Sequence, residues 1–392
     1  MTNVNEAEPY PRSRAAVGGG VVAQRAWRST ARYRPVLALV IALVAIFSAT
    51  QPVFRSAQNV QNLLSGVSVL WIVAMGMTFA LLSGGADISV GALVSLDGFF
   101  LAKVTHTGIP DWLALIALLV FGAVVAGGVN GVLIGRLRLS FFVVTLASMT
   151  AFTGILNIWS GTSSVSVNSR FVNGLAADKF LGIQDPIWVM ILTFVVALYV
   201  QRFTYLGRDI YATGGSPQAA RLSGINSSRT LIIVYAIVGV SAAVGSVVSV
   251  SRIGVASPQV DDNLPLEAIA AALLGGTALG GGAGGVEGTV FGTLFIGVLA
   301  NGLDLSGVPS FWQQVVTGVI LVAAVLGNQT GASSSTWIAR LVHSGGPDDE
   351  GRSMTRHGRA EPDPQKLGAN GPALDRTELR KPALSDAEAA SE

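Results

Sequence analysis

The stretch NLLSGVSVLWIVAMGMTFALLSGGADISVG, residues 62–91, carries no charged side chain before Asp87. A helix crosses the hydrocarbon core of a bilayer with about 20 mostly apolar residues, so this stretch predicts a membrane-spanning helix over Leu63–Leu82. Charged residues make up only 12% of the 392, about half the share usual in soluble domains. Similar uncharged windows recur along the chain, at Pro35–Phe54, Trp112–Gly135, Ser140–Ser169, Thr230–Ser251 and Leu305–Ala339. The sequence therefore predicts a polytopic membrane protein.

The apolar segments predict an all-α fold with about ten transmembrane helices, some of them short or broken. The expected spans are Pro35–Ala49, Leu63–Leu82, Val90–Val104, Trp112–Ile134, Phe141–Trp159, Ile187–Val200, Thr230–Val250, Leu266–Leu274, Val290–Leu303 and Phe311–Leu326. They form a transmembrane domain over residues 35–327. The flanking segments 1–34 and 328–392 are polar and mixed in charge, and we expect both to be disordered cytoplasmic segments.

The distribution of Lys and Arg predicts the orientation. With the N-terminus in the cytoplasm and ten alternating spans, twenty of the 25 basic residues lie in cytoplasmic segments. Only five lie outside: Arg55, Lys103, Arg170, Lys179 and Arg252. Cytoplasmic loops of membrane proteins carry an excess of Lys and Arg, so both termini are predicted to be cytoplasmic.

Other residue types point to no catalytic chemistry. The chain has no cysteine, which excludes disulfides and thiol catalysis. The histidines, His106, His343 and His357, fall in loops or in the tail without the spacing of metal ligands. We therefore predict no catalytic, cofactor-binding or metal-binding residue in this chain.

Glycines flank the shortest spans. Gly84 and Gly85 precede Val90–Val104, which at 1.5 Å per residue is shorter than the roughly 30 Å core. A glycine-rich run, 275–288, precedes the ninth span. Irregular backbone at membrane depth is tolerated inside protein or along a wet cavity, as in the discontinuous helices of transporters. Close packing of helices through small residues is the alternative, and the two are compatible.

A polar island interrupts the apolar sequence at GGSPQAARLSGI, residues 214–225. Ser216 is a good N-cap, Pro217 suits the first helical position and Gly224 suits the left-handed residue past the end. A short helix is therefore predicted over residues 218–222. Because a helix of two turns is not stable alone in water, the membrane domain or a partner protein must hold it. An ordinary cytoplasmic loop is the alternative.

Five segments carry a more specific signal: LLSGGADISVGALVSL (81–96), RLRLSFFVVTLASMTAFTGI (136–155), GRDIYATGGSPQAARLSGI (207–225), LEAIAAALLGGTALGGGAGGVEGTVFGTLFIGVLANGL (266–303) and SFWQQVVTGVILVAAV (310–325). In this order they resemble the permease subunit of bacterial ABC importers for monosaccharides, the ribose/xylose type. The resemblance covers about residues 35–327. It implies a multi-pass permease of the bacterial cytoplasmic membrane that moves a pentose- or hexose-like solute inward.

The resemblance also implies partners. A separate ABC ATPase subunit would supply the energy, an extracytoplasmic sugar-binding protein would deliver the solute, and the permease would form a homodimer in the bilayer, with no nucleic acid involved. ATP and Mg²⁺ would be used by the ATPase, since this chain has no G-x-x-x-x-G-K-[ST] motif and is not itself an enzyme. The island would be the coupling helix that docks on the ATPase. Its expected coupling residues are Gly214, Gly215, Ser216, Pro217, Gln218, Ala219, Ala220, Arg221 and Gly224.

Three motif matches are rejected. LSGGA (82–86) is similar to the ABC ATPase signature but follows an apolar span, with no phosphate-binding loop before it. The G-x-G-x-x-G match at Gly280, Gly282 and Gly285 lies in a glycine-rich run without a strand–helix unit around it. The glycosylation motif at 226–228 falls in a loop predicted to be cytoplasmic.

Acidic residues near membrane depth are expected to face protein or water, because a charge at the bilayer centre costs about 2.5–3.5 kcal/mol. Asp87 is expected to cap the short helix that follows it, and Asp97 to line the pathway or to bond a neighbouring helix. The expected translocation-pathway residues are Asp87, Ser89, Asp97, Thr145, Asn157, Glu267, Asn301 and Gln313, with Ser68 and Ser148 as further hydroxyl candidates.

The chain departs from the family pattern at four positions: Ser216 stands for the usual Asn, Gln218 for the usual Glu, Glu267 for a frequent Asp, and Pro265 for a commonly acidic residue. Two other function classes compete with the importer. A carrier driven by a proton or sodium gradient would bury coupled carboxylates or histidines, and here the deep acids are few and no histidine lies in a span. A non-transporting scaffold or sensor would act through its polar tails.

Overall fold

The structure is a computed structural model that describes residues 34–333, with side chains as far as residue 326. Its membrane-length and shorter apolar helices are α2 (Arg34–Thr50), α3 (Ala57–Leu82), α4 (Val90–Thr105), the joined α5 (Asp111–Val125), η2 (Ala126–Gly131) and α6 (Val132–Gly135), α7 (Phe141–Ser160), α9 (Asp185–Phe203), α12 (Ser227–Ile253), α13 (Leu264–Leu274), α14 (Val286–Leu305) and α15 (Ser310–Ser333). Each of the ten predicted spans coincides with one of them, so the helical membrane fold is confirmed.

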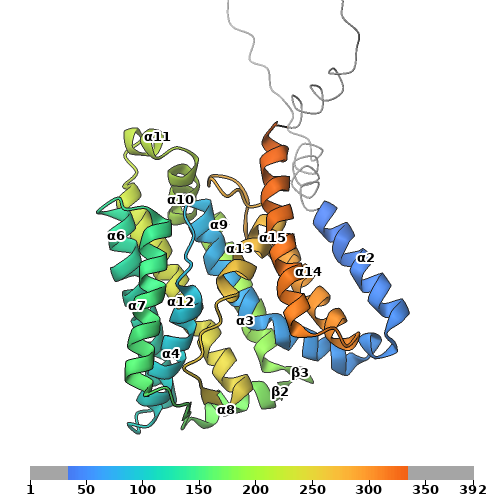
Figure 1. The fold of residues 1–392 in the computed structure, drawn as a ribbon. Helices are drawn as coiled ribbons and strands as arrows, with labels where there is room; N and C mark the ends of the chain where they lie inside the picture. The colour runs from blue at the N-terminus through green and yellow to red at the C-terminus, as the bar shows by residue number, and fades with distance from the viewer. Residues whose placement is uncertain (1–33, 334–392) are drawn as a thin grey trace, which may run out of the picture. The chain divides into compact units, whose positions relative to one another are not determined.

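Shorter elements join these helices (Figure 1). They are η1 (Pro52–Arg55), α8 (Arg170–Ala177), α10 (Tyr205–Gly215), α11 (Pro217–Leu222) and the strands β1 (Val165–Ser166), β2 (Lys179–Phe180), β3 (Ile183–Gln184) and β4 (Val255–Ala256). Of these, only α11 was expected from the sequence. The predicted terminal segments, 1–34 and 328–392, fall almost wholly outside the described residues, although α15 continues as far as Ser333.

Within the described residues, six helices are long and apolar enough to cross a membrane: Ala57–Leu82, Asp111–Gly135, Phe141–Ser160, Asp185–Phe203, Ser227–Ile253 and Val286–Leu305. Helices α2, α13 and the first part of α15 are shorter but apolar. Helix α4 carries Asp97 and Lys103 within its 16 residues. At 1.5 Å per residue α4 and α13 reach only about 24 and 16 Å, so both are partial spans.

Helices α3 and α12 form the centre of the bundle. Buried residues make up 78% of the most apolar window of α3 and 56% of that of α12, and the two helices pack on each other. Helices α4 and α5 cover α12, and α13 and α14 cover α3. Because these central helices are apolar on every side, burial inside protein rather than an amphipathic stripe sets their place.

The loops alternate between two ends of the bundle. At one end β1 pairs antiparallel with β4, His106 Nε2 lies 2.9 Å from the Ser166 carbonyl oxygen, and Gln51 bonds Ser306. At the other end, called the α11 end below, α11 lies together with α6, the start of α2 and the end of α15 (Figure 1). This arrangement matches ten antiparallel spans with both described ends on one side. That the α11 end is cytoplasmic remains a prediction from the Lys and Arg distribution.

Small residues bring the helices into backbone contact. A Cβ atom on Gly122 of α5 would lie 2.6 Å from the carbonyl oxygen of Gly239 in α12, and one on Gly239 would overlap the carbonyl of Gly122. Gly292 of α14 lies in the same way against the carbonyl of Ala271 in α13. Helix association in lipid depends on such van der Waals contact, because lipid tails supply no hydrophobic drive between helices. Close packing through small residues is therefore present in this bundle, at glycines other than those that flank the short spans.

Irregular backbone lies inside the protein as well. The segment 83–89 between α3 and α4 is almost entirely buried, and the Gly282 N–H of the glycine-rich segment donates to the Leu82 carbonyl oxygen at 2.9 Å. The segment 83–89 precedes the short helix α4, and the glycine-rich segment follows the short helix α13. The protein thus supplies the hydrogen bonds that lipid cannot, as expected for interrupted helices.

A substitution at Gly292 tests the contact between α13 and α14. We expect Gly292→Ala to lower the free energy of unfolding by about 1–3 kcal/mol, because the new methyl group meets the backbone of Ala271 rather than a movable side chain. Thermal unfolding of the purified protein in detergent measures the effect. Gly154→Ala on α7, where a Cβ has no heavy atom within 4 Å, is the matched control. Equal melting temperatures for the two variants would contradict the prediction.

Candidate functional site

A buried polar network joins α4, η2 and α7. Asp87 Oδ1 accepts hydrogen bonds from the Ser89 N–H at 2.8 Å and from Ser89 Oγ at 2.5 Å, immediately before α4 begins. Asn130 Nδ2 donates to Asp87 Oδ2 at 3.1 Å and to Ser89 Oγ at 2.9 Å, and Ser148 Oγ donates to Asn130 Oδ1 at 2.5 Å. Asp87 therefore bonds Ser89, the residue before α4, and none of the free N–H groups of the helix itself, so it does not cap α4 in the way that the sequence predicts. The carboxamide of Asn130 links Asp87 to α7.

The π-helical turn η2 brings Asn130 into this network. Its sequence, AGGVNG, places Gly127 and Gly131 against Ala236 and Ile232 of α12, so the wider turn lies directly on the neighbouring backbone. π-Helical turns are rare and are frequent at functional sites. This turn could not be predicted from the residues, because the pattern of Trp112–Ile134 predicts one continuous apolar helix.

Two of the predicted pathway residues, Asp97 and Thr145, are fully buried and are not among the lining residues of the cavity described below. Both carboxylate oxygens of Asp97 are buried and have no hydrogen-bond partner among the described residues. The hydroxyl of Thr145 is likewise buried and has no partner there. Asp97 Oδ2 lies beside Gly122 of α5, close to Ala243 of α12. Asn157 has the opposite environment, since its side chain is exposed on α7.

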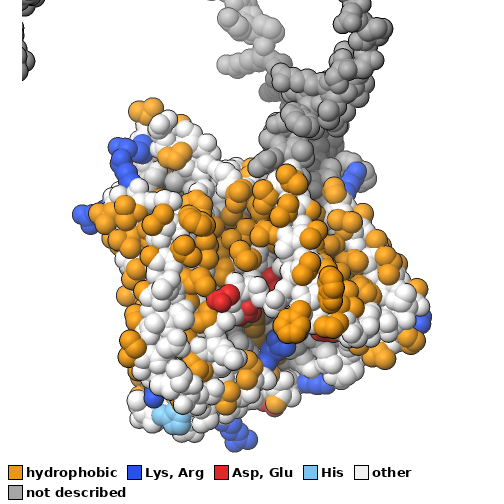
Figure 2. All heavy atoms as spheres, viewed as in Figure 1, with side chains coloured by type: hydrophobic (Ala, Val, Ile, Leu, Met, Phe, Trp, Pro, Cys, Tyr) orange, Lys and Arg blue, Asp and Glu red, His pale blue; other side chains and the backbone are white. Residues whose placement is uncertain are grey.

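A cavity of about 490 Å³ lies between α3, α13, α14 and α15. The predicted residues Glu267, Asn301 and Gln313 all line it, so helices far apart in sequence bring these three together. Its other polar lining residues are Asn62, Arg252, Asp261, Asn263, Asp304, Ser310, Gln314 and Thr317. Acidic side chains are visible in a hollow of the surface in Figure 2.

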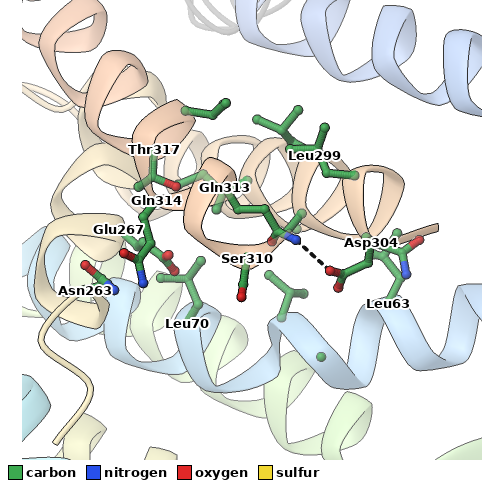
Figure 3. A pocket seen from close by; sticks show the side chains of 18 of the residues that line it. Leu63, Leu70, Asn263, Glu267, Leu299, Asp304, Ser310, Gln313, Gln314 and Thr317 are labelled. Carbon is green, nitrogen blue, oxygen red and sulfur yellow. Dashed lines mark hydrogen bonds between the residues drawn. The ribbon is translucent and has the colours of Figure 1, made fainter. Parts of the chain in front are cut away.

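The cavity combines carboxylates and carboxamides. Gln313 Nε2 donates to Asp304 Oδ1 at 2.6 Å, while Gln314 lies near Glu267 and Asn263 at the other end (Figure 3). Asn301 exchanges hydrogen bonds of 3.0 and 3.2 Å with Asn59. Carboxylates accept hydrogen bonds and carboxamides both donate and accept them, so this lining suits a small neutral ligand with many hydroxyl groups.

The sequence contained a signal for the missed lining residues of α15. Ser310, Gln314 and Thr317 share with the predicted Gln313 the spacing of one helical face within an otherwise apolar segment. Asp261 and Asn263 could not be found in this way, because they belong to the loop before α13 and reach the cavity only through the tertiary fold.

The polar island forms the predicted short helix α11. Ser216 Oγ accepts a hydrogen bond from the Ala219 N–H at 3.3 Å, Pro217 stands at the first position, and Gly224 is left-handed with φ +82°. Ala220 is buried, whereas Leu222 is 91% exposed. The membrane domain therefore holds one side of α11, and the other side is open.

Glycines join the base of the island to the cavity helices. A Cβ on Gly214, at the end of α10, would overlap the Leu82 carbonyl oxygen and lie 2.8 Å from the Gly282 nitrogen. One on Gly281 would lie 2.8 Å from the nitrogen of Gly84. This glycine junction, made of Gly84, Gly214, Gly215, Gly281 and Gly282, connects α10 to the end of α3 and to the segment before α14.

A second set of contacts joins the start of α14 to α9 and the segment before α14 to α10. Arg202 at the end of α9 forms an ion pair with Glu287 in the first turn of α14. Gln201 bonds the same carboxylate at 2.8 Å and accepts from the Val286 N–H at 2.7 Å. The start of α14 is thus tied to α9, and Tyr211 of α10 donates to the Gly284 carbonyl oxygen at 2.8 Å. The segment before α14 is therefore bonded to α10, the helix that precedes the island.

Comparisons with known proteins agree with this architecture. The family described as "Branched-chain amino acid transport system / permease component" matches residues 59–325. The chain is 38% identical over 297 residues to the ribose import permease protein of Escherichia coli K12, covering 75% of this chain and 92% of that protein. It is 39% identical over 295 residues to the ribose import permease protein of Bacillus subtilis, covering 74% and 91%. No solved structure matches the chain.

A xylose relative extends the comparison. The xylose transport system permease protein of Escherichia coli K12 is 34% identical over 353 aligned residues, covering 74% of this chain and 90% of that protein. Together with the apolar helices, these matches define a multi-pass permease of the bacterial cell membrane. The chain belongs to the family of ABC-importer permease components, and its relatives there are sugar permeases.

Removing Asn130 tests whether the buried network stabilises the fold. We expect Asn130→Ala to lower the free energy of unfolding by about 1–3 kcal/mol, because Asp87 and Ser148 each lose a buried hydrogen-bond partner. Asn157→Ala, which removes an exposed carboxamide, should leave the melting temperature nearly unchanged. Thermal unfolding in detergent compares the two variants, and a melting temperature of Asn130→Ala equal to that of the parent would refute the role.

Proposed function

We propose that this chain is the membrane-spanning subunit of an ABC importer that moves a monosaccharide of the pentose or hexose type into the cytoplasm. A separate ATPase supplies the energy and uses ATP and Mg²⁺, and an extracytoplasmic binding protein delivers the sugar. The chain itself binds no cofactor. Two copies form the permease, and α11 docks on the ATPase at the cytoplasmic side.

The observation that carries this proposal is that α11 is connected, through α10, to helices that line the cavity. Helix α11 follows α10, whose last residues lie in the glycine junction against α3 and the segment before α14. Helices α3 and α14 both line the cavity that contains Glu267 and Gln313. A partner that moves α11 would therefore move two walls of the cavity. The similarity to ribose and xylose permeases supports a monosaccharide as the solute.

Reconstitution tests the proposal directly. Proteoliposomes containing this chain, its ATPase and its binding protein should accumulate a radiolabelled monosaccharide only when ATP is present on the ATPase side. Uptake should persist when a protonophore removes the proton gradient. Accumulation by the chain alone, without ATP, would favour the gradient-driven carrier and refute the importer. ATP-dependent uptake of ribose, xylose or another sugar in a panel would also identify the solute.

A substitution at Gly224 tests the coupling role of α11. Gly224→Val should reduce uptake at least tenfold while the membrane helices stay folded, because a β-branched residue strains the left-handed conformation that ends α11. Gly108→Val is the matched control, since Gly108 has φ +78°, is equally open to solvent and lies at the opposite end. Uptake and ATPase activity are measured on the same proteoliposomes. If both variants transport equally, α11 is an ordinary loop.

The cavity is tested at Glu267. Glu267→Gln should lower uptake about 10–100-fold, because hydrogen bonds from sugar hydroxyls to a carboxylate contribute about 1.5–3 kcal/mol. Asp111→Asn, at the start of α5 and away from the cavity, controls for the loss of one negative charge. The readout is the initial rate at several solute concentrations. An unchanged rate for Glu267→Gln would exclude this carboxylate from the pathway.

A further inference from the structure

A second pocket, of about 760 Å³, lies at the α11 end of the molecule. The loop after α6, one side of α11 and the start of α12 enclose it. Its polar lining residues are Arg138, Gln218, Arg221, Asn226, Ser227 and Ser228. The remaining lining is mainly apolar and includes Ile134, Leu139 and Leu231. We call it the basic pocket.

The charge of the basic pocket is uncompensated. Arg138 and Arg221 line it, Arg136 and Arg229 stand next to it in the sequence, and no acidic side chain is among the lining residues. Within residues 34–326 none of these four guanidinium groups has an ion-pair partner. Basic side chains gather at this end in Figure 2. Positive charge that no acidic side chain of the lining balances favours an anion in the pocket.

Neutral groups of the pocket also favour an anion. Helix α12 has 27 residues and begins with Ser227 in the lining of the pocket, so the positive end of its dipole lies beside the pocket, with the Arg229 N–H already bonded to Asn226 Oδ1. Ser227 Oγ is buried and has no hydrogen-bond partner in the described structure. The hydroxyl of Ser227 can donate a hydrogen bond to an oxyanion, and so can the carboxamide of Gln218.

The surface beside the pocket is apolar. Leu137, Leu139 and Phe142 are 60%, 49% and 55% exposed along the same edge, where α7 begins. Arg138, between the two leucines, adopts a left-handed backbone conformation with φ +57°, which is uncommon for a residue with a long side chain. The loop therefore directs a guanidinium into the pocket while its neighbours present apolar side chains at the membrane edge.

We propose that the basic pocket binds the phosphate of an anionic phospholipid of the leaflet at the α11 end. The phosphate would accept hydrogen bonds from Arg138 and Arg221, and the acyl chains would cover Leu137, Leu139 and Phe142. A lipid headgroup fits better than free phosphate because charged and apolar surfaces are continuous here. Since Arg138 belongs to the loop before α7 and Arg221 to α11, the lipid would hold α11 against the membrane domain.

Lipid binding to the full chain, purified and delipidated in detergent, tests this site. Native mass spectrometry should show phosphatidylglycerol bound more tightly than phosphatidylcholine, and Arg138→Gln should weaken phosphatidylglycerol binding at least about tenfold. Arg138→Lys, which keeps the charge, should retain most of the affinity and shows that position 138 tolerates change. Arg55→Gln, an exposed arginine at the opposite end, should bind like the parent.

Four results would overturn the proposal. Equal affinity for phosphatidylglycerol and phosphatidylcholine would exclude recognition of the anionic headgroup. Displacement of the lipid by millimolar inorganic phosphate would identify a free-anion site instead. An equal loss of affinity in Arg138→Gln and Arg55→Gln would indicate nonspecific charge attraction. Unchanged lipid binding in Arg138→Gln, with lost association of the ATPase subunit, would assign the pocket to the protein partner.

Discussion

The carbonyl oxygen of Leu82 accepts a hydrogen bond from the Gly282 N–H at 2.9 Å, and Gly214 covers it so closely that no side-chain carbon fits between them. Three segments that are far apart in the sequence therefore meet backbone to backbone. Such a contact has no flexible side chain to absorb a displacement, since interiors are packed to the density of organic crystals. The island, the end of α3 and the segment before α14 form one mechanical unit. The proposed importer depends on this contact more than on any single side chain.

The polar side chains inside the bundle are of two kinds: some bond other protein groups, and others face the cavity. Lipid offers no hydrogen bonds, so polar side chains inside the bundle must find protein partners or face water. Asp87, Ser89, Asn130 and Ser148 satisfy one another and hold α4 in place. In the cavity, by contrast, Glu267 and its neighbours face open space that a hydroxylated solute can fill. The first group stabilises the fold, and the second lines the cavity that we propose as the pathway.

The helical spans and the island could be predicted from the sequence because their signals are local. Uncharged windows mark each span, and Ser216, Pro217 and Gly224 mark the ends of α11. The cavity could be predicted only in part, since its walls come from four helices whose relative rotation is set by packing. Glu267, Asn301 and Gln313 line it, while Asp87, Ser89, Asp97 and Thr145 lie in the bundle interior and Asn157 is exposed. Depth in the membrane can be judged from the sequence, and the polar face of α15 can be found by its spacing, but the sequence does not say which helices that face meets.

The π-helical turn at 126–131 adds one residue to a single turn of the helix that runs from Asp111 to Gly135. Beyond this turn every side chain is rotated by about 100° from where a regular helix would place it. A helical-wheel projection drawn across the whole span would therefore assign residues 132–135 to the wrong side. Mutagenesis or cysteine labelling designed from such a wheel would misplace Ile134 and Gly135, which are buried in the structure. The two halves of this span need separate projections, joined at Asn130.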